Sequence, residues 1–229
     1  MPDPLYDALI MLPAYNEAVS IGYTLTELTH YAPAARKVVI DNNSIDGTAG
    51  LARELGAIVF YVPEQGKGNA VRYSLARILD LPWSWLVMMD SDFTYPAKHV
   101  REVVERLVQG ADVVMGYRRT KAPGSMPAIN GLGNKCLSVL ASGLYGLWVR
   151  DVCTGLWGFR REALEQFKLT STGFTLEAEM LVEARRTKCR IAQIPIEYRA
   201  RLDGDRPKLK VRDGFKIGLF LIDGRGLAR

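Results

Sequence analysis

The sequence predicts an α/β protein with a mostly parallel sheet flanked by helices on both faces. Strand-like runs alternate with helix-like segments through the first half of the chain. Polar clusters follow the ends of these strands, which is where open α/β sheets bind ligands. Hydrophobic residues make up 48% of the 229 residues, which is enough for one sizeable core.

The alternation is clearest over residues 1–120. Short apolar runs bounded by turn residues predict strands at 9–12, 37–41, 57–62, 85–90 and 112–117. The segments between them predict helices at 18–31, 46–55, 67–79 and 96–108. Asp46 is the expected N-cap of the second helix, and Pro96 is expected in the first turn of the fourth.

The second half, residues 121–229, is less regular. We expect helices at 129–147, 174–187 and 211–222, and strands at 155–159 and 190–198. No repeat or clear linker divides the chain, so a single domain is expected over residues 1–229. Cys136, Cys153 and Cys189 lack CxxC spacing, which argues against a disulfide framework and a zinc site.

The charge is mildly positive, with 30 Lys and Arg against 25 Asp and Glu, and a basic cluster at 199–216. The cluster fits a solvated loop or a site for anionic groups, and without an aromatic platform we do not expect nucleic-acid binding. No signal peptide is evident, and the apolar run 136–149 is too short to span a bilayer. We expect a cytoplasmic protein without a transmembrane segment, and peripheral contact with the inner face of the membrane stays open.

The sharpest chemical signal is Asp90-Ser91-Asp92, at the end of the fourth expected strand. Alternate residues of an extended chain point to the same side, so the two carboxylates can converge. Converging carboxylates repel each other unless a cation neutralises them, and such oxygen ligands suit Mg²⁺ or Mn²⁺ bound together with substrate phosphates. The alternative is an ordinary turn in which Asp92 caps the residues that follow.

Polar residues also follow the first two strands. Pro13, Tyr15 and Glu17 come after the first, where Tyr15 could stack on a base. The run DNNSIDGT after the second begins at Asp41 and includes Asn43, and it could bond a nucleobase or ribose before starting a helix.

A glycine-rich segment, Gly66-Lys67-Gly68, follows the third strand. It lacks the ending of a P-loop and the third glycine of a dinucleotide fingerprint, which excludes ATPase and dehydrogenase functions. Lys67 and the first amides of the helix could still approach an anionic ligand.

In this order and spacing the motifs resemble glycosyltransferase family 2, which has the GT-A fold. The match covers nearly the whole chain, through LPAYNEA, DNNSIDGT, GKGNAVRYSL, MDSDFTYP, GYRR, DVCTGLWGFRREAL and GFTLEAEMLVEA. Within the family the chain is most similar to the dolichyl-phosphate mannose synthase and polyprenyl-phosphate glycosyltransferase branch. The resemblance implies a nucleotide diphosphate sugar donor, a divalent metal (Mg²⁺ or Mn²⁺), and inversion at the anomeric carbon.

Residue roles follow from the resemblance and from the clusters above. The expected nucleotide-sugar contacts are Pro13, Tyr15, Glu17, Asp41, Asn43, Lys67 and Asp90. The expected metal site is Asp90 and Asp92, with Thr94 acting through a water. Catalytic roles are expected for Asp90, Asp92, Arg118 and Asp151, the last within a D-x-x-T-G element. The expected acceptor and phosphate contacts are Arg118, Arg160, Glu177, Arg199, Arg201, Arg206 and Lys208.

The acceptor decides whether a base is needed. A polyprenyl phosphate, with a second pKa near ~6, is largely dianionic at neutral pH and needs cations to position it. A hydroxyl acceptor would need a base, for which Asp151, Glu177 and Glu179 are the candidates. A polyprenyl phosphate enzyme is the first hypothesis, with residues 1–120 as the donor half and 121–229 as the acceptor half. A soluble enzyme acting on a hydroxyl and a non-catalytic nucleotide-sugar-binding protein are the alternatives.

An apolar surface for the lipid is also expected. The run 136–149, with Phe215, Leu219, Phe220 and Leu221, could contact an isoprenoid tail or the membrane surface. An ordinary core helix over 136–149 is the competing interpretation.

Overall fold

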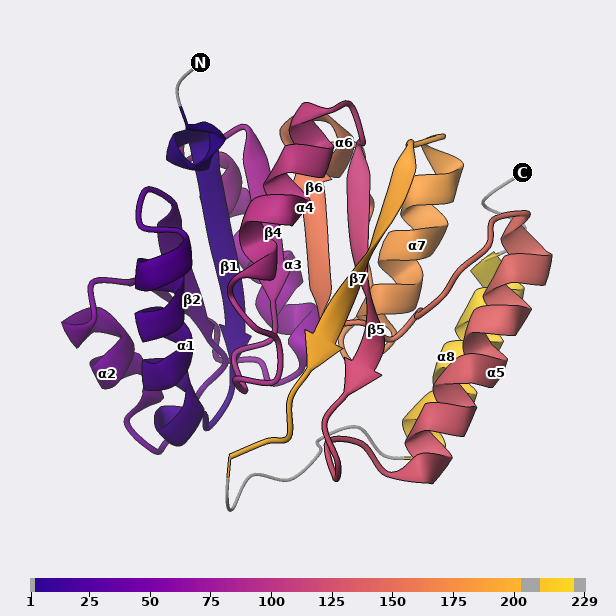
Figure 1. Cartoon of the computed structure of the whole chain (residues 1–229), viewed down its shortest axis with the longest axis horizontal. Helices are drawn as coiled ribbons and strands as arrows, with labels where there is room; N and C mark the ends of the chain where they lie inside the picture. Colours follow the sequence, from indigo (N-terminus) through magenta and orange to yellow (C-terminus); the bar gives the residue numbers. More distant parts are fainter. Residues whose placement is uncertain (1–2, 203–210, 225–229) are drawn as a thin grey trace.

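A seven-stranded sheet runs through the protein in the order β3-β2-β1-β4-β6-β5-β7 (Figure 1). The computed structural model describes residues 3–202 and 211–224. The strands are β1 (Ala8–Ala14), β2 (Arg36–Asp41), β3 (Ile58–Tyr61), β4 (Trp85–Met89), β5 (Val113–Lys121), β6 (Leu156–Arg160) and β7 (Ile191–Tyr198). Among the strands of these described residues, only β6 runs antiparallel to its neighbours, β4 and β5, so the expected mostly parallel sheet is confirmed.

Helices cover both faces of this sheet. They are the short 3-10 helix η1 (Pro4–Asp7), then α1 (Ala18–Tyr31), α2 (Thr48–Glu54), α3 (Lys67–Leu79), α4 (His99–Val108), α5 (Ala128–Tyr145), α6 (Arg161–Leu164), α7 (Leu176–Arg186) and α8 (Val211–Gly224). Successive residues of a strand point to opposite faces, so β1 sends Leu9 into one core and Ile10 into the other. Helices α1, α2 and α4 cover the Ile10 face, while α3, α7 and the pair α5–α8 cover the Leu9 face.

Helices α5 and α8 lie side by side at one end of the molecule, although a long stretch of chain separates them (Figure 1). The Tyr145 hydroxyl of α5 donates a hydrogen bond to the Leu221 carbonyl of α8 at 2.6 Å. At Gly224 a Cβ atom would come within 2.9 Å of Val182 on α7, so only glycine lets α8 approach α7 this closely. No helix among residues 3–202 and 211–224 is long and apolar enough to cross a membrane.

Three expected helix starts differ from the structure by two or three residues, and one of them is α7, which begins at Leu176 and not at residue 174. The helix expected from Pro96 begins at His99, because Pro96 and Ala97 form turns whose carbonyls accept hydrogen bonds from His99 and Val100. Helix α2 begins at Thr48, and its N-cap is Gly47 in the left-handed conformation (φ 89°), so the expected N-cap Asp46 is wrong. Asp46 precedes the N-cap and accepts hydrogen bonds from the amide and hydroxyl of Thr48. The short helices η1 and α6 were not expected.

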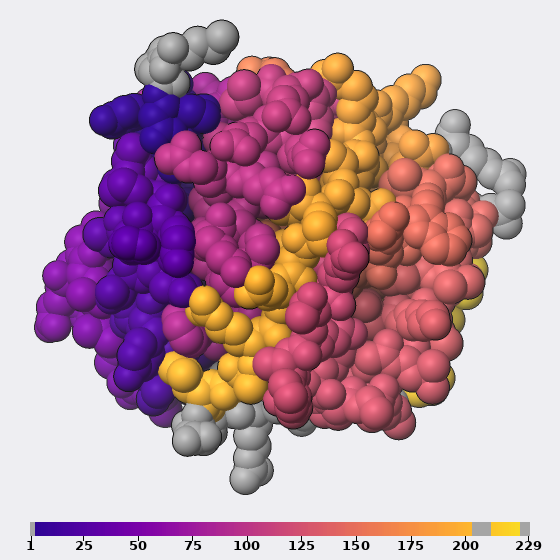
Figure 2. Space-filling view, viewed as in Figure 1, coloured from indigo at the N-terminus to yellow at the C-terminus, as the bar shows by residue number. Residues whose placement is uncertain are grey.

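The parallel strands place their carboxyl ends at one edge of the sheet, the lower edge in Figure 1. In the space-filling view the ends of β5 and β7 reach this edge beside α5 (Figure 2). The loops that follow β1, β2, β4 and β5 therefore meet in one place.

Candidate active site

Asp90 and Asp92 follow β4 and line one cavity of about 920 Å³. The amide of Asp90 donates a hydrogen bond to the Gly155 carbonyl at 3.1 Å. A Cβ atom at Gly155 would lie only 2.0 Å from Asp90 Oδ2. The glycine of the D-x-x-T-G element therefore makes room for the Asp90 carboxylate.

Lys67, the first residue of α3, connects two carboxylates in this cavity. Its Nζ lies 2.5 Å from Asp90 Oδ1 and 2.6 Å from Glu177 Oε1 of α7. Burial alone would lower the pKa of Lys67, but Asp90 and Glu177 raise it above its ordinary value. Burial also raises the pKa of Asp90; Lys67 opposes that rise, while Asp92 and Glu177 add to it. The cluster is thus a partly buried network in which a lysine cation binds two acids.

Asp92 is held by two different groups. Its Oδ1 accepts hydrogen bonds from the Thr94 amide at 3.2 Å and the Thr94 hydroxyl at 2.5 Å. Its Oδ2 accepts one from Arg201 Nη2 at 2.5 Å. Thr94 is fully buried and does not line the cavity, and its hydrogen bonds orient the Asp92 carboxylate.

Arg118 and Asp151 form a buried pair beneath the cavity. Arg118 Nε donates to Asp151 Oδ2 at 2.7 Å, and Nη2 donates to Oδ1 at 2.6 Å. Asn134 of α5 also donates to Asp151 Oδ1, at 2.8 Å. Asp151 does not itself line the cavity, whereas Arg118 does. These contacts engage both carboxylate oxygens of Asp151.

The loop after β1 lines the cavity as expected, through Pro13, Tyr15 and Glu17. After β2, the lining residue is Asn42; neither Asp41 nor Asn43 lines the cavity. Asn42 Oδ1 accepts a hydrogen bond from the Gly66 amide at 2.7 Å. Its Nδ2 donates to the carbonyls of Val62 and Glu64, so Asn42 joins the loops after β2 and β3.

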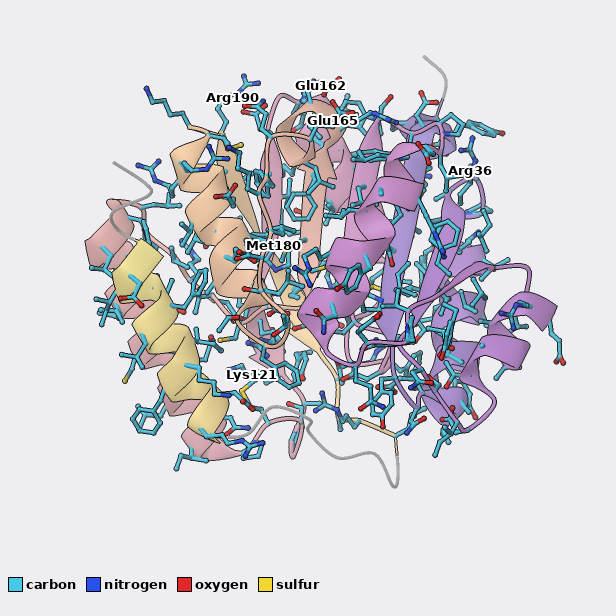
Figure 3. The ribbon with its side chains drawn as sticks, turned by 180° about the vertical axis from the view of Figure 1, so that it is seen from behind. Arg36, Lys121, Glu162, Glu165, Met180 and Arg190 are labelled. Atoms are coloured by element: carbon cyan, nitrogen blue, oxygen red, sulfur yellow. The ribbon has the colours of Figure 1, made fainter. Side chains whose placement is uncertain are left out.

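Two expected phosphate-binding arginines lie elsewhere. Arg160 pairs with Trp85, the first residue of β4, so it lies at the edge of the sheet opposite Asp90 and donates to the Leu107 carbonyl. Figure 3 shows that opposite edge, with Glu162, Glu165 and Arg190 far from Lys121. The physical reason is the antiparallel direction of β6, which carries the chain away from the cavity.

Arg199 binds Glu27 of α1 through both of its terminal nitrogens, at 2.9 and 2.7 Å, and does not line the cavity. Of the expected basic residues, Arg118 and Arg201 do line it, as does the acidic Glu177. Arg206 and Lys208 lie outside the described residues.

A polar wall formed by the start of α5 and the residues just before it was not expected from the sequence. Ser125, Asn130 and Asn134 line the cavity there. Asn130 and Asn134 are four residues apart and therefore share a helix face, a spacing that could have indicated this wall. Ser125 is 5% exposed, and within the described part of the chain its hydroxyl has no hydrogen-bond partner.

The cavity continues as an apolar groove between α5 and α8. Side chains from the two helices line it, namely Ile129, Leu137, Leu140, Phe215, Leu219 and Ile222. Phe215 and Leu219 are 74% and 63% exposed, whereas Leu221 is fully buried in the core. Within 136–149, Ala141 and Tyr145 are buried in the core, whereas Val139 and Trp148 are more than half exposed, so the segment has both a core face and an apolar surface.

The charges around the cavity suit a divalent cation. Among the described lining residues the acids are Glu17, Asp90, Asp92 and Glu177, and the bases are Lys67, Arg118 and Arg201. Asp151 already balances Arg118, so an excess of negative charge remains. In the described ranges no group of three or more His, Cys, Asp or Glu could hold a metal. Asp90 and Asp92 would therefore share an ion with substrate oxygens and water, which is common for Mg²⁺.

The sequence matches a known protein family over most of its length. The model of "Glycosyl transferase family 2" matches residues 9–167, well over half of the chain. The chain belongs to this family. It is therefore a glycosyltransferase, and the resemblance inferred from the motifs is confirmed.

Similar curated proteins include members of the expected branch of family 2. The chain is 35% identical to glycosyltransferase AglJ of Haloferax volcanii, covering 96% of this chain and 72% of that protein. It is 36% identical to the dolichyl-phosphate hexose transferase of the same organism, covering 85% and 84%. It is 25% identical to the polyprenol monophosphomannose synthase of Mycolicibacterium smegmatis, covering 86% and 79%.

Solved structures confirm the GT-A fold of this family 2 member. Glucosyl-3-phosphoglycerate synthase from Mycobacterium tuberculosis, crystallised with Mn²⁺, UDP-glucose and phosphoglyceric acid, superimposes with a TM-score of 0.76. The alignment covers 96% of this chain and 79% of that one at 22% identity.

Proposed function

We propose that this glycosyltransferase moves a hexosyl group from a nucleotide diphosphate sugar to a polyprenyl phosphate, with inversion at the anomeric carbon. The observation that carries this proposal is the single cavity that joins the charged cluster at Asp90 and Asp92 to the apolar groove between α5 and α8. An acceptor with an anionic head and an apolar tail matches both ends of it. The names of two similar proteins, a dolichyl-phosphate hexose transferase and a polyprenol monophosphomannose synthase, support the same acceptor class.

The start of α5 supports a phosphate-bearing acceptor. The first amides of a helix have no intrahelical partners and favour anions. The first turn of α5 contains no acidic residue, and no side chain caps it. The buried Ser125 hydroxyl, which has no partner among the described residues, lies in the same wall of the cavity. Arg201 adds a cation to the lining of the same cavity.

The acidic side chains also favour a phosphate over a hydroxyl acceptor. A hydroxyl needs a general base, and the three candidates are all engaged. Asp151 binds Arg118, Glu177 binds Lys67, and Glu179 accepts hydrogen bonds from Thr170 and Ser171. A phosphate acceptor is already anionic at neutral pH and requires no such base.

The donor side of the proposal rests on the first half of the chain. Pro13, Tyr15, Glu17 and Asn42, which line the cavity, would contact the nucleotide. Asp90 and Asp92 would hold Mg²⁺ or Mn²⁺, which when bound stabilises negative charge on the departing diphosphate. Thr94 fixes the orientation of Asp92 for this role. The similar structure crystallised with Mn²⁺ and UDP-glucose agrees with this assignment.

The exposed apolar side chains of the groove support peripheral membrane contact. Phe215 and Leu219 of α8 and Ile129 of α5 are each more than half exposed. A polyprenyl chain resides in a bilayer, and an apolar rim lets the enzyme receive it there. We accordingly propose a protein at the cytoplasmic face of the membrane, with residues 1–120 as the donor half and 121–229 as the acceptor half.

A transfer assay tests this function directly. A panel of nucleotide diphosphate sugars would be offered with a short polyprenyl phosphate, and in parallel with the corresponding alcohol. The proposal expects metal-dependent transfer to the phosphate, which EDTA suppresses and Mn²⁺ restores. Transfer to the alcohol instead would favour the hydroxyl-acceptor alternative, and donor binding without transfer to any acceptor would favour a nucleotide-sugar-binding protein.

A further inference from the structure

Asp92 is arranged differently from Asp90, although both acids line the same cavity. One Asp92 oxygen is bound to Thr94, and the other accepts a hydrogen bond from Arg201 at 2.5 Å. The Asp92 oxygen with which a cation would interact is therefore already bound to a positively charged group of the protein itself.

The two cations of the site differ in how firmly they are anchored. Lys67 begins α3, binds both Asp90 and Glu177, and its side chain is 15% exposed. Arg201 lies beyond the end of β7, outside any helix or strand. It donates one hydrogen bond of 2.5 Å to Asp92, without the two-bond geometry that Arg118 makes with Asp151. Because Lys67 is fixed by the backbone of α3 and Arg201 lies outside regular structure, Arg201 is the better placed of the two to move.

We propose that Arg201 is an exchangeable counter-ion of Asp92. It holds Asp92 Oδ2 before the divalent ion binds, leaves that oxygen when the ion arrives, and then becomes available to the acceptor phosphate. The inference rests on the proposed function. It adds that binding of the divalent ion at the donor side favours binding of the acceptor phosphate.

The exchange follows from charge. A guanidinium and a divalent cation repel each other, so both cannot remain against the same carboxylate oxygen at low cost. A hydrogen bond to a charged group contributes roughly 1.5–3 kcal/mol, so breaking the Arg201 contact reduces the apparent affinity for the ion by about tenfold or more. The released guanidinium suits phosphate, which it can bind through two parallel hydrogen bonds.

The first test measures Mn²⁺ binding without any sugar donor, from the electron paramagnetic resonance signal of free Mn²⁺. Arg201→Gln should bind Mn²⁺ about tenfold more tightly than the wild type, because the competing cation is gone. Arg190→Gln is the matched control, since it removes the same charge at the opposite edge of the sheet (Figure 3). It should change Mn²⁺ affinity less than twofold, as roughly expected of a distant screened charge.

Arg201→Lys tests the same point with the charge retained, and it should bind Mn²⁺ with an affinity between those of the wild type and Arg201→Gln. Thermal melting of all variants checks the fold. Equal Mn²⁺ affinity in the wild type and Arg201→Gln would overturn the counter-ion role and leave the proposed function standing. Absence of Mn²⁺ binding by every variant would overturn both this role and the metal dependence of the proposed function.

The second test concerns the phosphate. Binding of geranyl phosphate would be measured by calorimetry with and without Mn²⁺. In the wild type Mn²⁺ should strengthen this binding, and in Arg201→Gln the strengthening should be about tenfold smaller. The same Mn²⁺ effect in both proteins would contradict the proposed release of Arg201 toward the acceptor.

Discussion

Arg118 binds Asp151 through two hydrogen bonds of 2.7 and 2.6 Å, with both side chains almost fully buried. Arg118 comes from β5, and Asp151 lies in the loop before β6. Asn134 of α5 binds the same carboxylate. One acid therefore joins three segments that surround the cavity, which gives Asp151 a structural role.

Asp151→Asn should destabilise the protein by about 3 kcal/mol, because it leaves the buried Arg118 charge without its partner. Urea denaturation would measure the change. Glu197→Gln is a control that also changes an acid to its amide, because the ion pair of Glu197 with Lys98 is exposed, and it should cost much less. If Asp151→Asn kept full stability and donor binding yet abolished transfer, Asp151 would be a catalytic base and the hydroxyl-acceptor alternative would gain.

Gly155→Ala should lower transfer by about 100-fold, because a displacement of a catalytic group by about 1 Å has an effect of this size. The added methyl group would collide with the Asp90 carboxylate. Steady-state kinetics and Mn²⁺ binding would both report it. Gly143→Ala is the matched control, since a Cβ there meets nothing within 4 Å, and its activity should remain unchanged. Unaltered Mn²⁺ affinity in Gly155→Ala would argue against Asp90 as a metal ligand.

Much of the fold could be predicted because the parallel strands are apolar runs between turn residues. The direction of β6 could not be predicted, since apolar and polar residues alternate in the same way in parallel and antiparallel strands. This explains the error at Arg160, which lies five residues after Gly155 and about 17 Å along an extended strand. The pairing of α5 with α8 was also not predictable, because it depends on contacts between segments far apart in sequence.

The site could be predicted where reactive side chains directly follow the end of a strand, as Asp90 and Asp92 do. It was harder to predict where the backbone conformation of a loop decides which side chain faces the cavity. Asn42 lines it while its neighbours Asp41 and Asn43 do not, a distinction that composition does not contain. Ser125 belongs to a loop whose position depends on the packing of α5, so its place in the cavity could not be predicted from the residues around it.

Leu219→Ser should raise the KM for a long polyprenyl phosphate by about tenfold, because it removes apolar contact with the lipid. The KM for a short, water-soluble analogue should change little. Val19→Ser provides a control of matched exposure, since Val19 is 65% exposed on α1 and outside the cavity, against 63% for Leu219. Equal effects of Leu219→Ser on long and short acceptors would contradict a tail-binding groove.

Tyr145 should make stability depend on pH in the alkaline range. Burial raises the pKa of Tyr145 from 10.0 to about 12, and its hydroxyl donates to Leu221. The stabilisation that the buried, protonated phenol gives to the folded protein is complete below pH 10, the pKa of tyrosine in the unfolded chain. It is lost as the pH rises toward 12, because in this range the unfolded chain releases the proton more readily than the folded protein does. Tyr145→Phe should be less stable by about 1 kcal/mol at pH 8.

The difference in unfolding free energy between wild type and Tyr145→Phe should shrink from pH 10 upward. Urea denaturation at a series of pH values measures this difference, and other alkaline titrations cancel in it. A constant difference up to pH 11 would show that the phenol is not protected by folding.

The late position of α8 in the sequence affects how the protein is made. Ribosomes release a chain from its N-terminus, so the strands of the sheet emerge before the partner of α5 does. Until then the apolar face of α5 has nothing from α8 to cover it. A nascent chain would therefore be able to form the core of the sheet first. The apolar face of α5 would stay exposed until translation ends, and chaperones or a nearby bilayer could cover it in the meantime.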